Sequence, residues 1–324
     1  MKNPFVTNGY VSPEYFCDRE KETAKIVSLL TNENNIALIS PRRLGKTDLL
    51  RHCFGQPEIK EHYHTFIIDI YATSSVRDFV NVFGKAVLDE LRPKGKSVWG
   101  TFLNVLASLR SEITFDMNGQ PTWGIGLGAI TNPSATLDEI FSYLNNAGKP
   151  CLIAIDEFQQ ITKYADDPNI EAALRTHIQR CSNAHFVFSG SHRHLMGAMF
   201  TSPARPFYQS VTLINLPPIS VDKYAEFCLK HFERVSKHLD TLVVTELYER
   251  FNGITSYMQK VMNILFSMTG TGEICIPSMI DTAINDLLDF SADTYDALLY
   301  QMPEKQRIVF MAIAAEGKAK AIAS

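Results

Sequence analysis

The sequence predicts an α/β fold built on a mostly parallel, five-stranded sheet and followed by an all-helical region. Strand-like apolar runs alternate with segments of helical spacing, and they lie at residues 36–39, 65–71, 151–155, 184–189 and 210–216. Short apolar runs of this kind are typical of strands buried on both faces of a parallel sheet. After Pro217 and Pro218 these runs stop and helical spacing remains, which predicts a domain boundary near Pro217.

The predicted helices fall into two groups on either side of this boundary. They are residues 13–30, 47–54, 76–91, 137–146 and 169–181 in the first part, and 221–234, 241–251, 257–268, 277–295 and 303–315 in the second. A β-hairpin insertion is expected at about residues 110–130, where strand-like segments flank Asn118, Gly119, Gln120 and Pro121. We therefore expect an α/β domain over residues 1–216, a helical domain over 217–296 and the start of a further, incomplete unit over 297–324.

Composition argues against several classes of protein. The 324 residues carry a net charge of -4, so bulk electrostatics does not favour polyanion binding. The 6 cysteines are scattered and form no C-x-x-C pair, which argues against a disulfide framework or a zinc site, and Cys151 is expected to be a buried thiol. Neither a signal peptide nor an apolar stretch of about 20 residues, the length that spans a bilayer, is found. We expect a cytoplasmic protein without a membrane segment.

A phosphate-binding loop is predicted between the strand at residues 36–39 and the helix that follows. Residues 40–47, Ser-Pro-Arg-Arg-Leu-Gly-Lys-Thr, fit the pattern G-x-x-x-x-G-K-[ST] except that Ser40 replaces the first glycine. In such a loop the backbone N–H groups and the helix N-terminus bind phosphates, the lysine reaches the β- and γ-phosphates, and the hydroxyl ligates Mg²⁺. The candidate nucleotide-binding residues are Ser40, Pro41, Arg42, Arg43, Leu44, Gly45, Lys46, Thr47 and Asp48.

Two carboxylates, Asp156 and Glu157, directly follow the strand at residues 151–155. Such a strand delivers them to the carboxyl edge of the sheet, where ligands of open α/β sheets bind. Asp156 and Thr47 are expected to hold Mg²⁺, and Glu157 to act as the general base for the attacking water. A basic loop without nucleotide and a solvated strand end are the alternatives, and the combination of the two motifs favours nucleotide binding. A positive φ at Ser40 would strain the loop.

These motifs resemble the AAA+ superfamily of P-loop ATPases and, more narrowly, the prokaryotic "archaeal ATPase" group, which is related to the STAND signalling ATPases. Residues 40–50 resemble the group's G-P-R-R-x-G-K-T-[ST]-L-L loop, and residues 153–158 resemble its Walker B strand. Further segments that resemble the group lie at residues 15–20, 188–191, 205–208 and 252–259. In the last segment, Thr255 and Ser256 stand where the group usually has proline and an aromatic residue.

The resemblance implies an AAA+ type sheet, a helical lid and the first helix of a winged helix-turn-helix unit near the C-terminus. It implies that Ser191 or Ser189 senses the γ-phosphate. Arg193 and Arg205 are implied candidates for stabilising transition-state charge, in this chain or toward a neighbouring subunit. A turn after a strand is the alternative role for the serines, and a surface or structural role is the alternative for the arginines.

The predicted function is ATP binding with Mg²⁺-dependent hydrolysis, used as a nucleotide-driven conformational switch. GTP is less favoured because no Asn-Lys-x-Asp motif is present. The resemblance places Phe16 and Arg19 near the base, with a hydrophobic staple as the alternative. A non-hydrolysing ATP-gated scaffold and a DNA-binding regulator remain as other functions, although the acid Glu157 favours turnover. ATP and ADP are the expected partners, whereas a homo-oligomer, a protein client and DNA contact through the only slightly positive residues 303–324 stay open.

Overall fold

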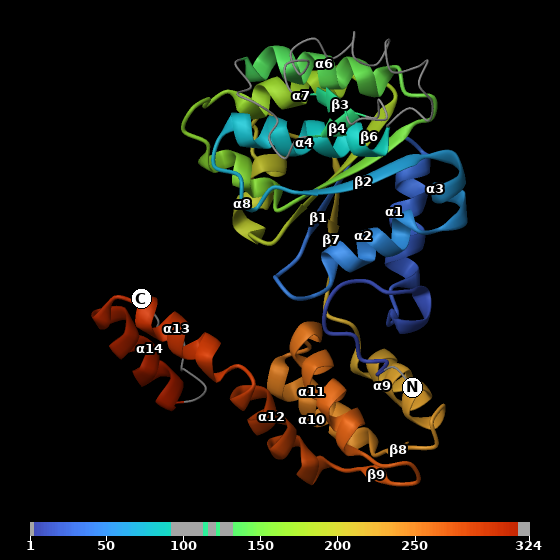
Figure 1. Cartoon of the computed structure of the whole chain (residues 1–324), viewed down its shortest axis with the longest axis vertical. Coiled ribbons are helices and arrows are strands. Elements are labelled where there is room, and N and C mark those ends of the chain that lie inside the picture. Colours follow the sequence, from blue (N-terminus) through green and yellow to red (C-terminus); the bar gives the residue numbers. More distant parts are fainter. Residues whose placement is uncertain (1–2, 92–112, 116–120, 124–131, 317–324) are drawn as a thin grey trace. The chain divides into compact units, whose positions relative to one another are not determined.

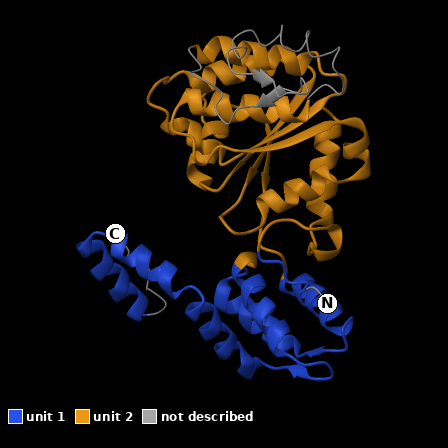
Figure 2. Ribbon diagram, viewed as in Figure 1, with its two compact units in different colours: residues 1–7, 221–253, 257–324 blue, residues 8–220, 254–256 orange. Residues whose placement is uncertain are grey.

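The computed structural model describes residues 3–91, 113–115, 121–123 and 132–316 (Figure 1). The chain divides into two compact units, which Figure 2 distinguishes by colour. The α/β unit comprises Asn8–Ser220 and Ile254–Ser256. The helical unit comprises Met1–Thr7, Val221–Gly253 and Tyr257–Ser324.

A five-stranded, all-parallel sheet forms the centre of the α/β unit, which confirms the predicted fold class. Its strands are β1 (Ile36–Ile39), β2 (His64–Asp69), β5 (Cys151–Asp156), β6 (Ala184–Gly190) and β7 (Thr212–Asn215). The strand order is β2-β5-β6-β1-β7, so β6 separates β1 from β5, and β2 lies at the edge. Because all strands are parallel, the carboxyl ends of β1, β5 and β6 meet at one edge of the sheet.

Helices cover both faces of this sheet (Figure 1). They are α1 (Glu20–Thr31), α2 (Lys46–Phe54), α3 (Pro57–His62), α4 (Val76–Glu90), α6 (Pro133–Asn145), α7 (Ile170–Arg180) and α8 (Arg193–Thr201), with the 3-10 helices η1 (Pro13–Tyr15) and η4 (Phe158–Lys163). Strand side chains alternate between two cores: Ile153 packs with α4, α6, α7 and α8, whereas Leu152 packs with α1, α2 and α3. Burial on both faces explains why β1, β5 and β6 are almost wholly apolar.

The single helix predicted over residues 13–30 is wrong, because the chain turns within it. η1 ends at Tyr15 and α1 begins at Glu20. Between them Asp18 and Arg19 have φ values of 57° and 79°. A right-handed helix does not continue through residues with positive φ. The turn leaves the Arg19 side chain 3% exposed, with one guanidinium nitrogen donating to the carbonyl oxygen of Pro217 at 2.7 Å.

The helical unit contains six α-helices among the described residues. They are α9 (Val221–Glu233), α10 (Thr241–Phe251), α11 (Thr255–Met268), α12 (Ile280–Asp289), α13 (Ala292–Gln301) and α14 (Glu304–Glu316), with the 3-10 helix η5 (Pro277–Met279) and the paired short strands β8 (His238–Leu239) and β9 (Ile274–Cys275). The helix predicted over residues 277–295 is therefore divided, since α12 ends at Asp289 and α13 begins at Ala292.

Residues 3–7, which the sequence analysis assigned to the first domain, group with the helical unit and not with the α/β unit. The Phe5 ring is fully buried, and its centroid lies 6.0, 5.9 and 5.7 Å from those of Phe227, Phe232 and Phe266. The Asn263 amide donates to the carbonyl oxygen of Phe5 at 2.7 Å. Contacts with residues more than 200 positions away hold this segment, and no local pattern predicts them.

The predicted β-hairpin is present as β3 (Ile113–Phe115) and β4 (Pro121–Trp123), which pair antiparallel. Its expected turn residues Asn118, Gly119 and Gln120 lie outside the described residues. The same holds for Lys318, Lys320 and residues 321–324, where a second helix of the C-terminal unit was expected.

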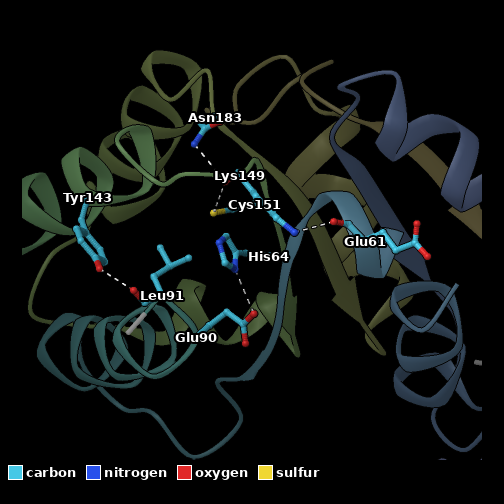
Figure 3. Close-up of polar contacts among 8 residues, drawn as sticks. All are labelled: Glu61, His64, Glu90, Leu91, Tyr143, Lys149, Cys151 and Asn183. Atoms are coloured by element: carbon cyan, nitrogen blue, oxygen red, sulfur yellow. Dashed lines mark hydrogen bonds and ion pairs between the residues drawn. The ribbon is translucent and has the colours of Figure 1, made fainter. Parts of the chain in front are cut away.

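Polar contacts hold the segments around the amino ends of β2 and β5 (Figure 3). The Lys149 ammonium donates to the carbonyl oxygen of Glu61 at 2.7 Å, and the Tyr143 hydroxyl donates to that of Leu91 at 2.9 Å. At the start of β5, burial raises the pKa of the Cys151 thiol to about 12, so this thiol stays neutral at ordinary pH. Cys151 is a buried free thiol, as predicted.

Phe5→Ala should destabilise the helical unit. Removing a fully buried phenylalanine ring costs about 3 kcal/mol or more through lost transfer energy and the cavity left behind. The matched control is Phe290→Ala, whose side chain is 81% exposed in the same unit and whose loss should cost less than about 0.5 kcal/mol. Urea unfolding followed by far-ultraviolet circular dichroism measures both, and equal midpoints for the two variants would show that Phe5 does not anchor the N-terminal segment.

Candidate active site

The predicted phosphate loop connects β1 to α2 at the carboxyl edge of the sheet. The Asp156 and Glu157 carboxylates lie at the end of β5, and Gly190 and Ser191 lie at the end of β6. Because β6 is the neighbour of both β1 and β5, the three segments face the same place. Residues that are more than 100 positions apart in the sequence are thus brought together.

The backbone of the loop explains how Ser40 can replace glycine. Positive φ values in the loop occur at Arg43 (69°) and Gly45 (83°), and Ser40 is not among the positive-φ residues. The strain considered for Ser40 therefore does not arise. Its side chain is 1% exposed, and its hydroxyl donates to the carbonyl oxygen of Pro41 at 3.0 Å.

Lys46 is the first residue of α2, and its side chain is only 6% exposed. The ammonium group donates to the carbonyl oxygens of Ser40 at 3.1 Å and Pro41 at 3.2 Å. Burial lowers the pKa of Lys46, while the charges of Asp156 and Glu157 oppose this shift. A buried ammonium whose hydrogen bonds go to neutral carbonyls is a strong binding point for an anion.

Thr47 and Asp156 join the loop to the end of β5. The Thr47 hydroxyl donates to Asp156 Oδ2 at 2.5 Å, and the Asp156 side chain is 6% exposed. Asp156 Oδ1 accepts the backbone N–H of Glu157 at 3.0 Å. A hydroxyl and a carboxylate side by side are the oxygen ligands that Mg²⁺ prefers.

Glu157 is held by two donors on the same carboxylate oxygen. The Ser191 hydroxyl donates to Glu157 Oε2 at 2.8 Å, and the side-chain amide of Gln159 donates to that oxygen as well. The Arg42 guanidinium contacts the Ser191 hydroxyl at 3.4 Å and lies 5.3 Å from the centroid of the Tyr71 ring. Of the two candidate sensor serines, Ser191 contacts this group, whereas the buried Ser189 hydroxyl has no hydrogen-bond partner in the part of the chain that the structure describes.

Gln159 and Tyr71 were missed by the sequence analysis. Gln159 lies two residues after Glu157. Its side chain can reach the Glu157 carboxylate only if the chain turns back at this point, and the sequence does not show such a turn. Glu157 has a φ of 55° and directly precedes η4, and this turn brings Gln159 to the Glu157 carboxylate. Tyr71 follows the edge strand β2, whose position in the sheet the sequence does not state.

Three of the other predicted residues, Arg205, Phe16 and Arg19, have contacts of their own, and Arg193 is exposed. Arg205 forms an ion pair with Glu171 of α7, and burial raises the pKa of that carboxyl while Arg205 opposes the shift. Arg193 is exposed at the start of α8. The Phe16 ring stacks on His52 at 4.5 Å, and Arg19 pairs with Glu22 at 2.9 Å.

The remaining loop residues surround the start of α2. Leu44 is buried, whereas Pro41, Arg42 and Arg43 are exposed. Burial raises the pKa of Asp48, which Arg51 partly opposes.

The residues at this edge fit a nucleoside triphosphate with Mg²⁺. Among the described residues, no side chain caps the N-terminus of α2 and none would meet a Cβ placed on Gly45 within 4 Å, so the backbone there is open to a phosphate. The buried ammonium of Lys46 supplies positive charge, and Thr47 with Asp156 supplies oxygen ligands. Within the described ranges, no three His, Cys, Asp or Glu side chains cluster as a metal site.

A phosphate loop that faces two carboxylates across a parallel sheet of this order defines the class of P-loop ATPases with an AAA+ type fold. Residues 16–261 match the family model described as "ATPase domain predominantly from Archaea". This match covers more than half of the chain, so the protein belongs to that family of ATPases.

Solved structures show the same fold at low sequence identity. The Walker-type ATPase Paby2304 of Pyrococcus abyssi is 17% identical with a TM-score of 0.61, and the match covers 92% of this chain and 79% of that one. The ORC2 protein of Aeropyrum pernix, in its ADPNP-ADP complexes, is 14% identical with a TM-score of 0.58, and the match covers 88% of this chain and 71% of that one. The ORC1 protein of Aeropyrum pernix in complex with DNA is 14% identical with a TM-score of 0.54, and the match covers 94% of this chain and 74% of that one. A search of curated proteins gave no match.

In the described part of the chain, no helix has both the length and the apolar character of a membrane span.

Lys46→Met should weaken nucleotide binding without destabilising the nucleotide-free protein. The variant loses the buried ammonium, which should cost about 2 kcal/mol or more of binding free energy, roughly 30-fold in Kd. The methionine fills the space of the lysine stem and carries no charge that must be desolvated. Titration with a fluorescent ATP analogue gives Kd, and a thermal melt gives the stability of the free protein.

The matched control for this measurement is Lys25→Met, which removes an exposed lysine of α1 and should leave Kd unchanged. Nucleotide affinity that is equal in the wild type and Lys46→Met would refute the assignment of the phosphate loop.

Proposed function

We propose that this ATPase hydrolyses ATP with Mg²⁺ and uses the nucleotide state to change the position or order of its helical unit. The observation that carries the hydrolytic part is the junction of Thr47 with Asp156, beside a Glu157 carboxylate held by Ser191. A chain that only bound nucleotide would need the loop but not a positioned second acid. This distinction favours an ATPase over a non-hydrolysing ATP-gated scaffold.

In this proposal each residue has a defined task. Lys46 and the first N–H groups of α2 bind the phosphates, and Thr47 and Asp156 hold Mg²⁺, which supplies charge neutralisation at the phosphate oxygens. Glu157 accepts the proton of the attacking water. Glu157 lies next to Asp156 at the edge of the sheet where the phosphates would bind, so the proton of the water would have only a short distance to travel.

The arginines near the loop differ in how they are held. Arg42, which contacts Ser191, is the cation placed to act in the same chain, and Ser191 is the residue placed to sense the γ-phosphate. Arg205 would have to leave its pair with the buried Glu171 in order to reach a phosphate. Arg193 is exposed, so in a homo-oligomer its side chain could act on the nucleotide of a second subunit.

The base of the nucleotide is assigned to the aromatic group beside α2. Phe16 stacks on His52, and the Tyr10 hydroxyl lies 3.0 Å from His52 Nδ1. A flat aromatic surface at this place is suited to stacking with adenine. Arg19 acts indirectly, because it ties the segment that carries Phe16 to Pro217.

A contact of the loop supports the proposed conformational switch. The backbone N–H of Ser256 donates to the carbonyl oxygen of Arg43 at 3.2 Å. Ser256 belongs to the α/β unit, but it is the second residue of α11, most of which belongs to the helical unit. A change of the loop on nucleotide binding would therefore reach the start of that helix through one hydrogen bond.

A DNA-binding regulator is the second candidate function. The solved ORC1 protein with the same fold is in complex with DNA. In this chain α14 carries Glu304 and Glu316 as well as Lys305 and Arg307, so its described residues provide no basic surface. The ATPase switch is favoured for this reason. Free, buried cysteines support a reducing, cytoplasmic setting for either function.

Glu157→Gln should abolish hydrolysis and retain nucleotide binding. The amide has nearly the same shape but accepts no proton, so kcat should fall by about 100-fold or more while Kd for ATP changes little. Phosphate release gives kcat, and equilibrium binding gives Kd. Glu58→Gln, which changes an exposed acid of α3, is the control and should hydrolyse ATP normally. Hydrolysis that persists in Glu157→Gln would remove Glu157 from the role of general base.

A further inference from the structure

We propose that Gln159 is a positioning residue that fixes the orientation of the Glu157 carboxylate for proton transfer. This inference rests on the proposed ATPase function and adds a residue to it. Gln159 belongs neither to the phosphate loop nor to the acidic pair, and it has no part in binding phosphate or Mg²⁺. Its proposed role rests on the hydrogen bond to Glu157, which depends on the turn after β5. This turn lies outside both sequence motifs.

The turn after β5 directs the Gln159 side chain back to Glu157. Glu157 has φ and ψ of 55° and 39°, the left-handed conformation, and the 3-10 helix η4 begins at the next residue. In this geometry the Gln159 Nε2 atom donates to Glu157 Oε2. A carboxylate accepts hydrogen bonds and does not donate them, so the amide must present its N–H₂ group to Glu157.

Two donors from different elements define where Glu157 Oε2 lies. Gln159 donates from η4, and Ser191 donates from the segment that follows β6 at 2.8 Å. Both contact Oε2, so neither of them occupies Oε1. With one oxygen fixed by two hydrogen bonds, the second oxygen has a defined direction in which to accept the proton of a water molecule. Fixing a reactive group through such supporting contacts is how a site gains precision.

Burial makes a merely structural role for the Gln159 amide a poor explanation. The side chain is 4% exposed, and its buried Oε1 atom has no hydrogen-bond partner among the described residues. An amide left half-satisfied in this way is less favourable than an apolar side chain of the same size. The amide therefore costs stability at this position, and its contact with Glu157 is the gain that the structure shows.

Gly190 at the end of β6 leaves the space that this amide needs. A Cβ placed on Gly190 would lie 2.4 Å from Gln159 Oε1 and 2.6 Å from Met196 Sδ. No side chain fits there unless Gln159 or Met196 moves. The arrangement thus involves residues of η4, β6 and α8.

The decisive experiment compares Gln159→Met with Gln160→Met. Methionine preserves the size of the side chain and removes the donor. Gln160 is the adjacent glutamine, but its amide donates to the carbonyl oxygen of Thr73 at 2.8 Å and not to Glu157. We expect kcat for ATP hydrolysis to fall roughly tenfold or more in Gln159→Met, by analogy with partners that orient metal ligands. Kd for a non-hydrolysable ATP analogue should stay within about twofold, and Gln160→Met should match the wild type in both.

A double variant separates positioning from packing. If Gln159 acts through Glu157, then Gln159→Met should cause no further loss of kcat in the Glu157→Gln background, whereas independent effects would multiply. Gln159→Glu serves as a second test, because it keeps the shape and replaces the donor with an acceptor, and it should also lower kcat. If both Gln159 variants fail to fold while Gln160→Met folds, Gln159 is structural and the inference is overturned.

Three further outcomes would overturn the inference. A wild-type protein that hydrolyses no ATP overturns the proposed function and this inference together. Normal hydrolysis by the wild type and by Gln159→Met overturns the inference alone. A loss of kcat in Gln159→Met accompanied by an equal loss of analogue binding also overturns it, since a positioning residue for the base does not alter the ground-state affinity.

Discussion

The candidate site depends on one constraint, which is that all five strands of the sheet run in the same direction with β6 between β1 and β5. Every functional segment therefore leaves the sheet at the same edge. The hydrogen bond from Thr47 to Asp156 spans from the segment after β1 to the end of β5, and Ser191 follows the strand between them. Reversing β1, β5 or β6 would carry the functional segment that follows it to the opposite edge, away from the other two.

The sequence predicts those parts of the fold whose burial leaves a periodic pattern. Strands such as β5 are buried on both faces and read as continuous apolar runs, so they could be predicted with their motifs. Positive φ at Asp18 and Arg19 leaves no such pattern, and the helix predicted across them fails. The burial of Phe5 among residues more than 200 positions away is likewise invisible locally.

In the site, a linear motif reveals its own members but not the residues that support them. Gln159 could not be predicted, because its contact with Glu157 exists only through the left-handed turn that begins η4. The same applies to Gly190, whose missing Cβ matters only because Gln159 and Met196 lie against it. Conversely, the glycine missing at Ser40 could be noted from the sequence, but whether it strains the loop depends on the backbone, where the positive φ values fall on Arg43 and Gly45.

A buried charge, the ammonium of Lys46, lies at the same edge of the α/β unit. Lys46 is buried with its ammonium on the carbonyl oxygens of Ser40 and Pro41, so a phosphate must compete with these two hydrogen bonds for the same donor. Satisfying the ammonium with an anion stabilises the bound loop relative to the free one. Arg43 lies in this loop, with its carbonyl oxygen on the backbone of Ser256. In the proposed switch, a rearrangement that begins at this buried charge would reach the start of α11 through the hydrogen bond between Arg43 and Ser256.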